Sequence, residues 1–366
     1  MTDDRISLRQ LLTLTFAALL SPAVQVLPGL TARRAGVGGW LAALLALPVL
    51  LLLCWGLWVL CRGGPGKGGL PCAAQRLLGP AAGRGLCLIY LLWGIWLLAA
   101  NARQAARRFL TISYRNGSML LFLFVLLGVS FWLARKPVRA LARAGEVFFL
   151  ALSVGLALSL GLGAFQVEAV NLLPVWLEDL PAAGGAALPV LGLLGYAVFA
   201  ACLGGHVISQ EHGRRTLLRW ATGLCLTLTG LQIVCLGSFG PGLAGRIDTP
   251  FYMMVRGVGF EGTFQRIESV IIALWALSDL ALLTLLTCAC GLLAQTVFGI
   301  RRRSVATVPV FLLGAAGAVV FFPDAFTLDW ALEGPALWGG VVLGFMVPLL
   351  LAAGIYRKEQ RTDGIY

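Results

Sequence analysis

The sequence predicts an all-α polytopic membrane protein with ten transmembrane helices, and three observations support this class. Of the 366 residues, 59% are hydrophobic and 12% are charged, against roughly 25% charged residues in a soluble domain. The apolar residues form blocks long enough for a helix to cross a bilayer. Lys and Arg gather in alternate loops between these blocks, which is typical of a multi-pass topology.

Ten apolar blocks define the expected membrane spans. They cover residues 8–31, 37–61, 85–103, 117–134, 146–166, 187–209, 217–239, 267–293, 304–322 and 336–356. When the loops are assigned to alternate sides, one side holds 19 of the 28 Lys and Arg residues and the other holds 9. The positive-inside rule then predicts that both termini are cytoplasmic. The N-terminus carries acids as well as arginines before a long apolar segment, so no cleavable signal peptide is expected.

The ten spans divide into two halves of five, and the odd number gives the halves opposite orientations. This arrangement predicts a 5+5 inverted repeat in a single domain over residues 1–366, with repeat A at about 8–166 and repeat B at about 187–356. The longest outer connection, residues 241–266, alternates charged and aromatic residues and is expected to form a re-entrant or interfacial lid.

The first span of each half contains residues that weaken a helix. Residues 20–29 read LSPAVQVLPG and place two prolines inside span 1, where each proline removes a backbone donor. Span 6 carries Gly192, Gly195 and the pair Gly204-Gly205. Since binding sites of inverted-repeat transporters lie at discontinuous helices in matching positions, we expect helices 1 and 6 to be interrupted beside a ligand site.

Asp279 is the clearest ionisable residue inside a span, twelve residues into span 8. A buried charge in a bilayer is costly, so it is either a protonatable group, a ligand for a substrate amine, or a hydrogen-bonded group that only joins helices. A basic cluster follows span 3 on the predicted outer side, at Arg103, Arg107, Arg108 and Arg115. It either attracts an anionic partner or lipid, or is solvated, and the solvated interpretation is favoured.

Other function classes have little support. The nine cysteines contain no CxxC motif, and His206 and His212 are the only histidines, so no metal site and no cofactor are expected. The sequence lacks GxSxG, HExxH and Walker A motifs and a paired-carboxylate signal, so an enzyme is not expected. The net charge of +12 follows the topology of the loops and does not indicate nucleic-acid binding.

Several stretches together resemble one family, the B subunits of bacterial spore germinant receptors, or endospore germination permeases. The matching stretches are ISLRQLLTL at Ile6–Leu14, LPGLTARRAGVGGWLAALLA at Leu27–Ala46, ARAGEVFF at Ala142–Phe149, NLLPV at Asn171–Val175, LGYAVF at Leu194–Phe199 and TPFYMMVRGVGFEGTFQRIESVIIALW at Thr249–Trp275. They follow one another in order over nearly the whole chain. The last contains Arg266, Glu268 and Trp275 in a fairly specific pattern.

The resemblance implies a ten-helix bundle of the amino acid–polyamine–organocation transporter type. It also implies a location in the spore inner membrane beside an A-type subunit and a lipoprotein C-type subunit. Two departures from the family pattern affect the expected ligand. Ser21-Pro22-Ala23 stands where the family commonly has a glycine-rich turn, and Ala197 stands where it commonly has a glutamate.

By analogy with the family, the pocket is expected at the break in span 1, facing spans 3, 6 and 8. The predicted ligand-binding residues are Ser21, Ala23, Val24, Gln25, Trp93, Gly94, Leu97, Tyr196, Phe199, Ala200, Ser278, Asp279 and Leu282. A small germinant, expected to be an amino acid, would place its carboxylate on backbone N–H groups freed at the break. The resulting hypothesis is a germinant-sensing receptor subunit that signals to partner subunits.

Two alternatives remain open at this point. One is a secondary transporter of amino acids or amines, with Asp279 in cation or proton coupling. The other is a structural membrane partner whose degenerate pocket binds no ligand.

Overall fold

The computed structural model describes residues 4–63, 66, 68–112, 117–208, 213–257 and 267–363, and of residues 112, 267–271 and 361–363 the backbone only. The first half contains α1 (Leu8–Ala35), the 3-10 turn η1 (Gly36–Leu41), α2 (Ala42–Cys61), α3 (Leu70–Leu78), α4 (Pro80–Ile112), α5 (Met119–Ala134) and α6 (Val138–Ala164). The 3-10 turns η2 (Ala169–Asn171) and η3 (Leu177–Asp179) lead into the second half.

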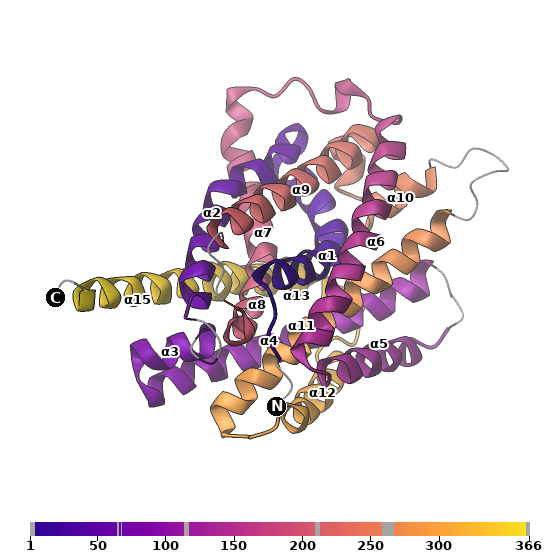
Figure 1. Ribbon diagram of the computed structural model, residues 1–366. Helices are drawn as coiled ribbons and strands as arrows, with labels where there is room; N and C mark the ends of the chain where they lie inside the picture. The colour runs from indigo at the N-terminus through magenta and orange to yellow at the C-terminus, as the bar shows by residue number, and fades with distance from the viewer. Residues whose placement is uncertain are drawn as a thin grey trace.

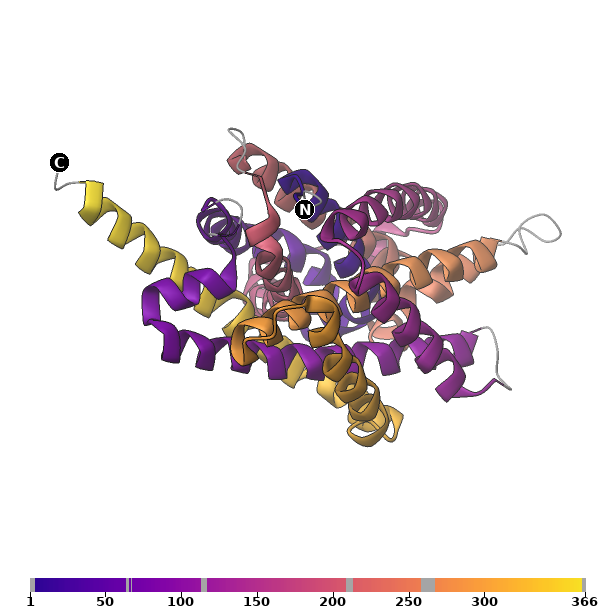
Figure 2. The ribbon, with the colours of Figure 1, turned by 60° about the horizontal axis from the view of Figure 1, so that its bottom comes forward.

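The second half begins with α7 (Leu180–Leu194), η4 (Gly195–Ala197), α8 (Val198–Cys202) and η5 (Leu203–His206). It continues with α9 (Gly213–Ala244), α10 (Pro250–Gly257), α11 (Ile267–Phe298), α12 (Arg303–Val320), α13 (Ala325–Glu333), α14 (Pro335–Gly339), the π-helical segment η6 (Gly340–Met346) and α15 (Val347–Asp363). The ribbon in Figure 1 shows how these helices surround α1, and in Figures 1 and 2 the C-terminal end of α15 projects beyond the body of the bundle.

The helices account for all of the predicted spans. Eight helical segments are long and apolar enough to cross a membrane. The first of them, Leu8–Cys61, contains both α1 and α2, and α5 is a shorter apolar helix. The described residues are therefore compatible with ten spans and confirm the all-α membrane class.

The first span of each predicted half is extensively buried. In the segment Leu177–His206, 94% of the apolar stretch is buried inside the protein, and α1 packs against α6, α7, α9 and α11. Helices in corresponding positions of the two halves also pack together: α1 with α7, α2 with α9, α4 with α11 and α5 with α12. The exact repeat boundaries stay a prediction.

The two expected interruptions have different outcomes. α1 runs as a single helix from Leu8 to Ala35 with both Pro22 and Pro28 inside it, so the predicted unwinding of helix 1 is not observed. A proline removes one hydrogen bond of a helix, and a neighbouring polar side chain can compensate for a locally opened ladder within a membrane. Span 6 is interrupted as predicted, because the 3-10 turns η4 and η5 flank the five-residue helix α8.

The glycines of span 6 also allow an unusually close helix crossing. A Cβ added at Gly340 would lie 1.7 Å from the carbonyl oxygen of Gly192, and one added at Gly195 would lie 2.3 Å from the carbonyl oxygen of Gly340. The backbones of α7 and η6 therefore touch, as in other small-residue contacts between membrane helices.

The connection expected to form a lid contains one helix. α10 packs against α1, α6 and α9, beside the C-terminal end of α1. Residues 258–266 of that connection, with Arg266, lie outside the described residues, as do Arg115, His212 and the side chain of Glu268.

Candidate functional site

A serine from α11 enters the backbone ladder of α1 one turn before Pro22. The Ser278 hydroxyl accepts a hydrogen bond from the Ser21 backbone N–H at 2.7 Å and donates to the carbonyl of Ala17 at 2.5 Å. In an α-helix the N–H of Ser21 would bond to that same carbonyl. Inserted side chains of this kind are a known cause of helix bending, and this one links α1 to α11 at the position where the sequence predicts a break.

A buried ion pair lies beside this insertion. Arg108 of α4 and Asp279 of α11 are only 7% and 5% exposed, and their Nη1 and Oδ2 atoms are 3.3 Å apart. The Ser21 hydroxyl joins the two, since it accepts from Arg108 Nη1 at 2.7 Å and donates to Asp279 Oδ1 at 2.6 Å. Burial of either charge alone would be costly, and the contact between the two side chains offsets part of that cost.

Two further groups orient the Arg108 guanidinium. Its Nη2 atom donates to the side-chain oxygen of Gln25 at 2.5 Å, and its Cζ atom lies 5.2 Å from the centre of the Trp275 ring. Arg108 thus connects α1, α4 and α11 through its planar head. A guanidinium suits this position because it offers several donors in one plane.

Three polar atoms at this site have no hydrogen-bond partner among the described residues. They are the Nε atom of Arg108, the Oδ2 atom of Asp279 and the side-chain oxygen of Gln104. Oδ2 is within ion-pair distance of Arg108 but outside hydrogen-bond geometry. Since buried polar atoms are nearly always paired, one unmatched donor and two unmatched acceptors indicate a site for a polar ligand or water.

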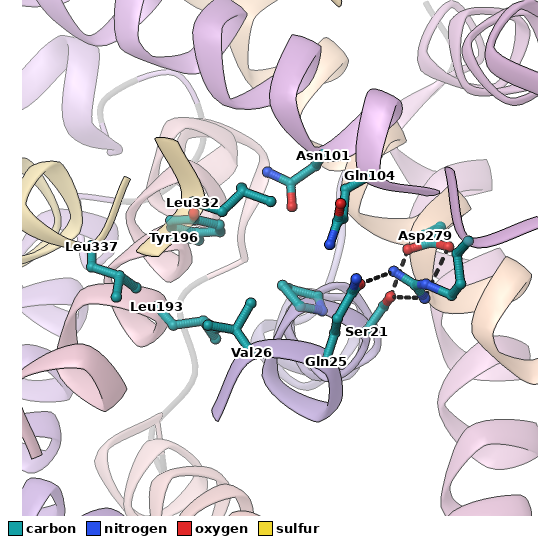
Figure 3. Close-up of a pocket in the computed structure, with 12 residues that line it drawn as sticks. Ser21, Gln25, Val26, Asn101, Gln104, Leu193, Tyr196, Asp279, Leu332 and Leu337 are labelled. Carbon is teal, nitrogen blue, oxygen red and sulfur yellow. Dashed lines mark hydrogen bonds and ion pairs between the residues drawn. The ribbon is translucent and has the colours of Figure 1, made fainter. Parts of the chain in front are cut away.

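These groups line a small cavity. Its lining residues are Ser21, Pro22, Gln25, Val26, Asn101, Gln104, Arg108, Leu193, Tyr196, Asp279, Leu332 and Leu337. Figure 3 shows Asn101 and Tyr196 facing one another across from the Arg108 network. The cavity measures about 10 Å³, which is room for one water-sized molecule.

A larger vestibule of about 650 Å³ adjoins the cavity and shares Gln25, Gln104 and Arg108 with it. It lies at the C-terminal ends of α1 and α4, which are the outer ends in the predicted topology. Five arginines and three acids line it: Arg33, Arg107, Arg108, Arg246, Arg256, Asp248, Asp329 and Glu333. The vestibule therefore reaches Arg108, one member of the buried ion pair.

Ion pairs join the helix α13 to two helices that line the vestibule, α4 and α1. Asp329 pairs with Arg107 of α4 at 2.8 Å, and Glu333, one turn later, pairs with Arg33 of α1 at 2.5 Å. Both pairs are partly exposed, so each contributes little stability alone. Together they hold α13 at the entrance.

The opposite end of the bundle is closed by the N-terminal segment. The N–H of Ile6 donates to the His206 carbonyl at 2.9 Å, and the N–H of Ile208 donates to the Ile6 carbonyl at 3.0 Å. Asp4 extends this closure, since its carboxylate accepts from the Arg139 backbone N–H at 3.0 Å. Among the described residues, these contacts cover the end of the bundle opposite the vestibule.

Four of the predicted site residues, Ser21, Gln25, Tyr196 and Asp279, line the cavity. Ser278 does not line the cavity, and it contacts the site through its hydrogen bond with the Ser21 backbone N–H. The predicted use of free backbone N–H groups is not supported at Ser21, because Ser278 occupies that donor. Arg108 supplies the cationic donor in its place.

The other predicted residues do not line the cavity. Trp93 and Phe199 form an aromatic layer with ring centres 5.0 Å apart, and Trp93 lies edge-on to Tyr196. Gly94 leaves no free space, because a Cβ there would lie 2.5 Å from Cys290 Sγ. Ala200 lines a separate apolar cavity. The remaining residues are buried in helix contacts: Ala23, Val24, Leu97 and Leu282.

Gln104 and Arg108 were not predicted as site residues. The predicted span 3 ends at residue 103, whereas α4 continues to Ile112 and carries these side chains into the bundle. Asn101, Gln104 and Arg108 are spaced i, i+3 and i+7, which places them on one helix face. Two features of the sequence could have identified these residues. One is this spacing, and the other is the excess of arginine on the side of the membrane where the positive-inside rule predicts few.

No group of three or more His, Cys, Asp or Glu residues in the described ranges is placed to hold a metal ion. The polar groups of the cavity are instead arranged for hydrogen bonding and charge pairing. Together, the buried ion pair, the interrupted span and the one-sided vestibule define a membrane protein of the permease class.

The profile of the spore germination protein family matches residues 5–324. The chain therefore belongs to the spore germination protein family. Among curated individual proteins, none matches it.

Two solved structures show the same fold at low sequence identity. MhsT in complex with L-phenylalanine is similar with a TM-score of 0.64 and 14% identity, over 95% of this chain and 88% of that one. The substrate-bound, outward-open structure of a Na⁺-coupled sialic acid symporter is similar with a TM-score of 0.66 and 10% identity, over 94% of this chain and 79% of that one. At these identities the likeness establishes the transporter fold alone.

Proposed function

We propose that this chain is the germinant-sensing transmembrane subunit of a spore germinant receptor and that it binds a small amino acid between α1, α4, α7 and α11. The observation that carries the proposal is the buried Arg108–Asp279 pair, which leaves unmatched polar atoms beside a cavity below a vestibule. Membership of the spore germination protein family supports the biological setting.

The unmatched atoms are complementary to a zwitterion. The Nε atom of Arg108 would donate to a ligand carboxylate, and a ligand ammonium would donate to Asp279 Oδ2 and to the side-chain oxygen of Gln104. Because the site contains one positive and one negative charge, a ligand with both charges adds no net charge to the interior. A purely cationic or anionic ligand would leave an excess charge buried.

Ligand binding requires a rearrangement, because the cavity holds only about one water-sized molecule. The ligand would enter through the vestibule and open the contacts of Arg108 with Gln25 and Ser21. A ligand that binds the opened state more tightly shifts the population toward it. We propose that this shift is transmitted to A-type and lipoprotein C-type subunits in the spore inner membrane, with both termini of this chain cytoplasmic.

A secondary transporter of amino acids or amines is the second candidate function. The vestibule on one face and the closure at Ile6 on the other are the arrangement expected of an alternating-access protein in one of its states. In that case Asp279 would take part in cation or proton coupling. Its pairing with Arg108 argues against this role, since a coupling ion would have to displace the guanidinium.

Two measurements on the purified chain separate these functions. Direct binding across a panel of amino acids tests the receptor, and uptake of a radiolabelled amino acid into liposomes tests the transporter. Saturable binding without gradient-driven accumulation supports the receptor. Robust accumulation driven by a cation or proton gradient supports the transporter, and binding of no amino acid contradicts the receptor proposal and an amino acid transporter.

A further inference from the structure

Two arginines enclose a tryptophan at the end of the bundle that holds the N-terminus. The guanidinium of Arg214, at the start of α9, lies 4.1 Å from the centre of the Trp58 ring, and that of Arg62 lies 5.1 Å from it. Arg62 also contacts the Tyr356 ring at 5.8 Å and pairs with Glu359 of α15. Among the described residues no carboxylate pairs with Arg214, so this cluster has an excess positive charge.

The N-terminus of α9 lies against the same tryptophan. A Cβ at Gly213, the first residue of the helix, would approach Trp58 Cδ1 at 3.3 Å and Leu8 Cδ2 at 3.4 Å. Since a helix N-terminus attracts anions, α9 adds to the field of the two guanidiniums at this position.

An apolar cavity lies directly beside the cluster. It measures about 20 Å³ and is formed where α1, α2, α8 and α9 meet, and its lining includes Leu8, Leu57, Cys61, Leu217 and Trp220. The Nε1 atom of Trp220 is buried and has no hydrogen-bond partner among the described residues. An apolar wall and a side chain with one unmatched donor therefore lie beside the arginines.

We propose that this junction of α1, α2 and α9 binds an anionic phospholipid. The lipid phosphate would lie against Arg214 and Arg62 at the N-terminus of α9, and the first methylene groups of an acyl chain would contact the apolar wall, since the cavity itself holds only one or two water-sized molecules. The unmatched Trp220 N–H would donate to an ester carbonyl of the glycerol backbone, which lies between these two regions of a lipid. A soluble anion would satisfy the arginines but would leave the apolar wall and the indole donor unused.

The proposal is independent of the amino acid site, because none of these residues lines the cavity or the vestibule around Arg108. It also does not depend on which face of the protein is cytoplasmic. Basic residues near a membrane surface attract anionic lipids with a free energy equivalent to about a fivefold change in affinity for each arginine.

The test is native mass spectrometry of the full chain with phosphatidylglycerol, and with phosphatidylcholine as the zwitterionic comparison. We expect preferential retention of phosphatidylglycerol, weakened about fivefold in Arg214→Gln, and a smaller loss in Trp220→Phe, which removes only the indole donor. Arg84→Gln is the matched control, because Arg84 is an exposed arginine of α4 outside the cluster. Since each variant is compared with itself in the two lipids, a change in overall stability does not imitate the result.

Equal retention of phosphatidylglycerol by Arg214→Gln and Arg84→Gln would overturn the proposal. Complete competition by soluble glycerol phosphate would overturn the part of it that concerns the acyl chain, since it would identify a site for free phosphate groups.

Discussion

At the scale of single residues, the site depends on a buried charge pair. Removal of either partner leaves the other charge buried without compensation. Arg108 and Asp279 come from different halves of the chain and meet at the Ser21 hydroxyl of α1. Ser21 stands in the Ser-Pro-Ala sequence inside α1. We infer that the hydroxyl of Ser21 and the cation of Arg108 form one unit, in which the serine orients both charges.

Removing one member of the pair should be more damaging than removing both. Arg108→Gln or Asp279→Asn leaves an uncompensated buried charge and should lower the free energy of unfolding by about 3–5 kcal/mol. The double variant should lose clearly less than the sum of the two. Thermal unfolding of the four proteins in one detergent gives this double-mutant cycle, and additive losses would show that the pair is not coupled.

Ser278→Ala should destabilise the protein by about 1–2 kcal/mol, because the Ala17 carbonyl and the Ser21 N–H both lose their shared partner. Ser159→Ala is the control, since the Ser159 hydroxyl only donates to a carbonyl within its own helix and its removal should change little. The same unfolding measurement compares the two. Similar losses in both would contradict a bridging role for Ser278.

At the scale of elements, the crossing of α7 and η6 illustrates a feature that sequence predicts only in part. The glycines of span 6 were expected to interrupt a helix, and the 3-10 turns η4 and η5 bear this out. Their second role, close contact with Gly340 and Gly344, depends on which helix lies opposite. Spacing within one segment gives no information about its partner, so the contact could not be predicted from the sequence.

Gly340→Ala should cost at least about 3 kcal/mol, since the added methyl group would collide with the Gly192 carbonyl and force two backbones apart. Gly184→Ala is the matched control in α7, where an added Cβ meets nothing within 4 Å, and it should be neutral or stabilise by up to about 1 kcal/mol. Unfolding temperature and the yield of monodisperse protein measure the difference. Normal stability of Gly340→Ala would mean that the crossing is looser than described.

The helix α13 should become more mobile when its two ion pairs are removed. In Asp329→Asn/Glu333→Gln, hydrogen exchange of the amides of Ala325–Glu333 should accelerate by up to about tenfold, with little change in global stability. Asp248→Asn removes another acid of the vestibule that has no ion-pair partner among the described residues, and exchange in α13 should then be unchanged. Identical exchange in all three proteins would show that the pairs do not hold α13.

At the scale of the whole molecule, hydropathy and charge predicted the membrane class and the order of the spans, because the bilayer imposes both directly on the sequence. The site was predicted less well. Asp279 and Ser21 were identified because a charge and a proline are conspicuous inside a span. Arg108 was missed because an arginine near a helix end is usually solvated, and only the tertiary fold shows that α4 turns this side chain inward.

In the described residues, the vestibule lies at the C-terminal ends of α1 and α4, and α13 lies at its entrance. The Arg108–Asp279 pair lies deeper in the bundle, and the segment around Ile6 covers the opposite end. This order suits a protein that detects a solute on one side of a membrane. The proposed sensing function therefore depends on the chemistry of the innermost pair.

The most direct test of this account is the binding of amino acids to the purified full chain and to Arg108→Gln, measured by isothermal titration calorimetry, with Arg84→Gln as the control. Loss of a charge-assisted contact to the ligand carboxylate, about 2–5 kcal/mol, should weaken binding by a factor of about 30 or more. We expect at least one zwitterionic amino acid to bind the wild type and Arg84→Gln equally and Arg108→Gln far more weakly. Equal affinity of that amino acid for folded Arg108→Gln and the wild type would contradict the central claim.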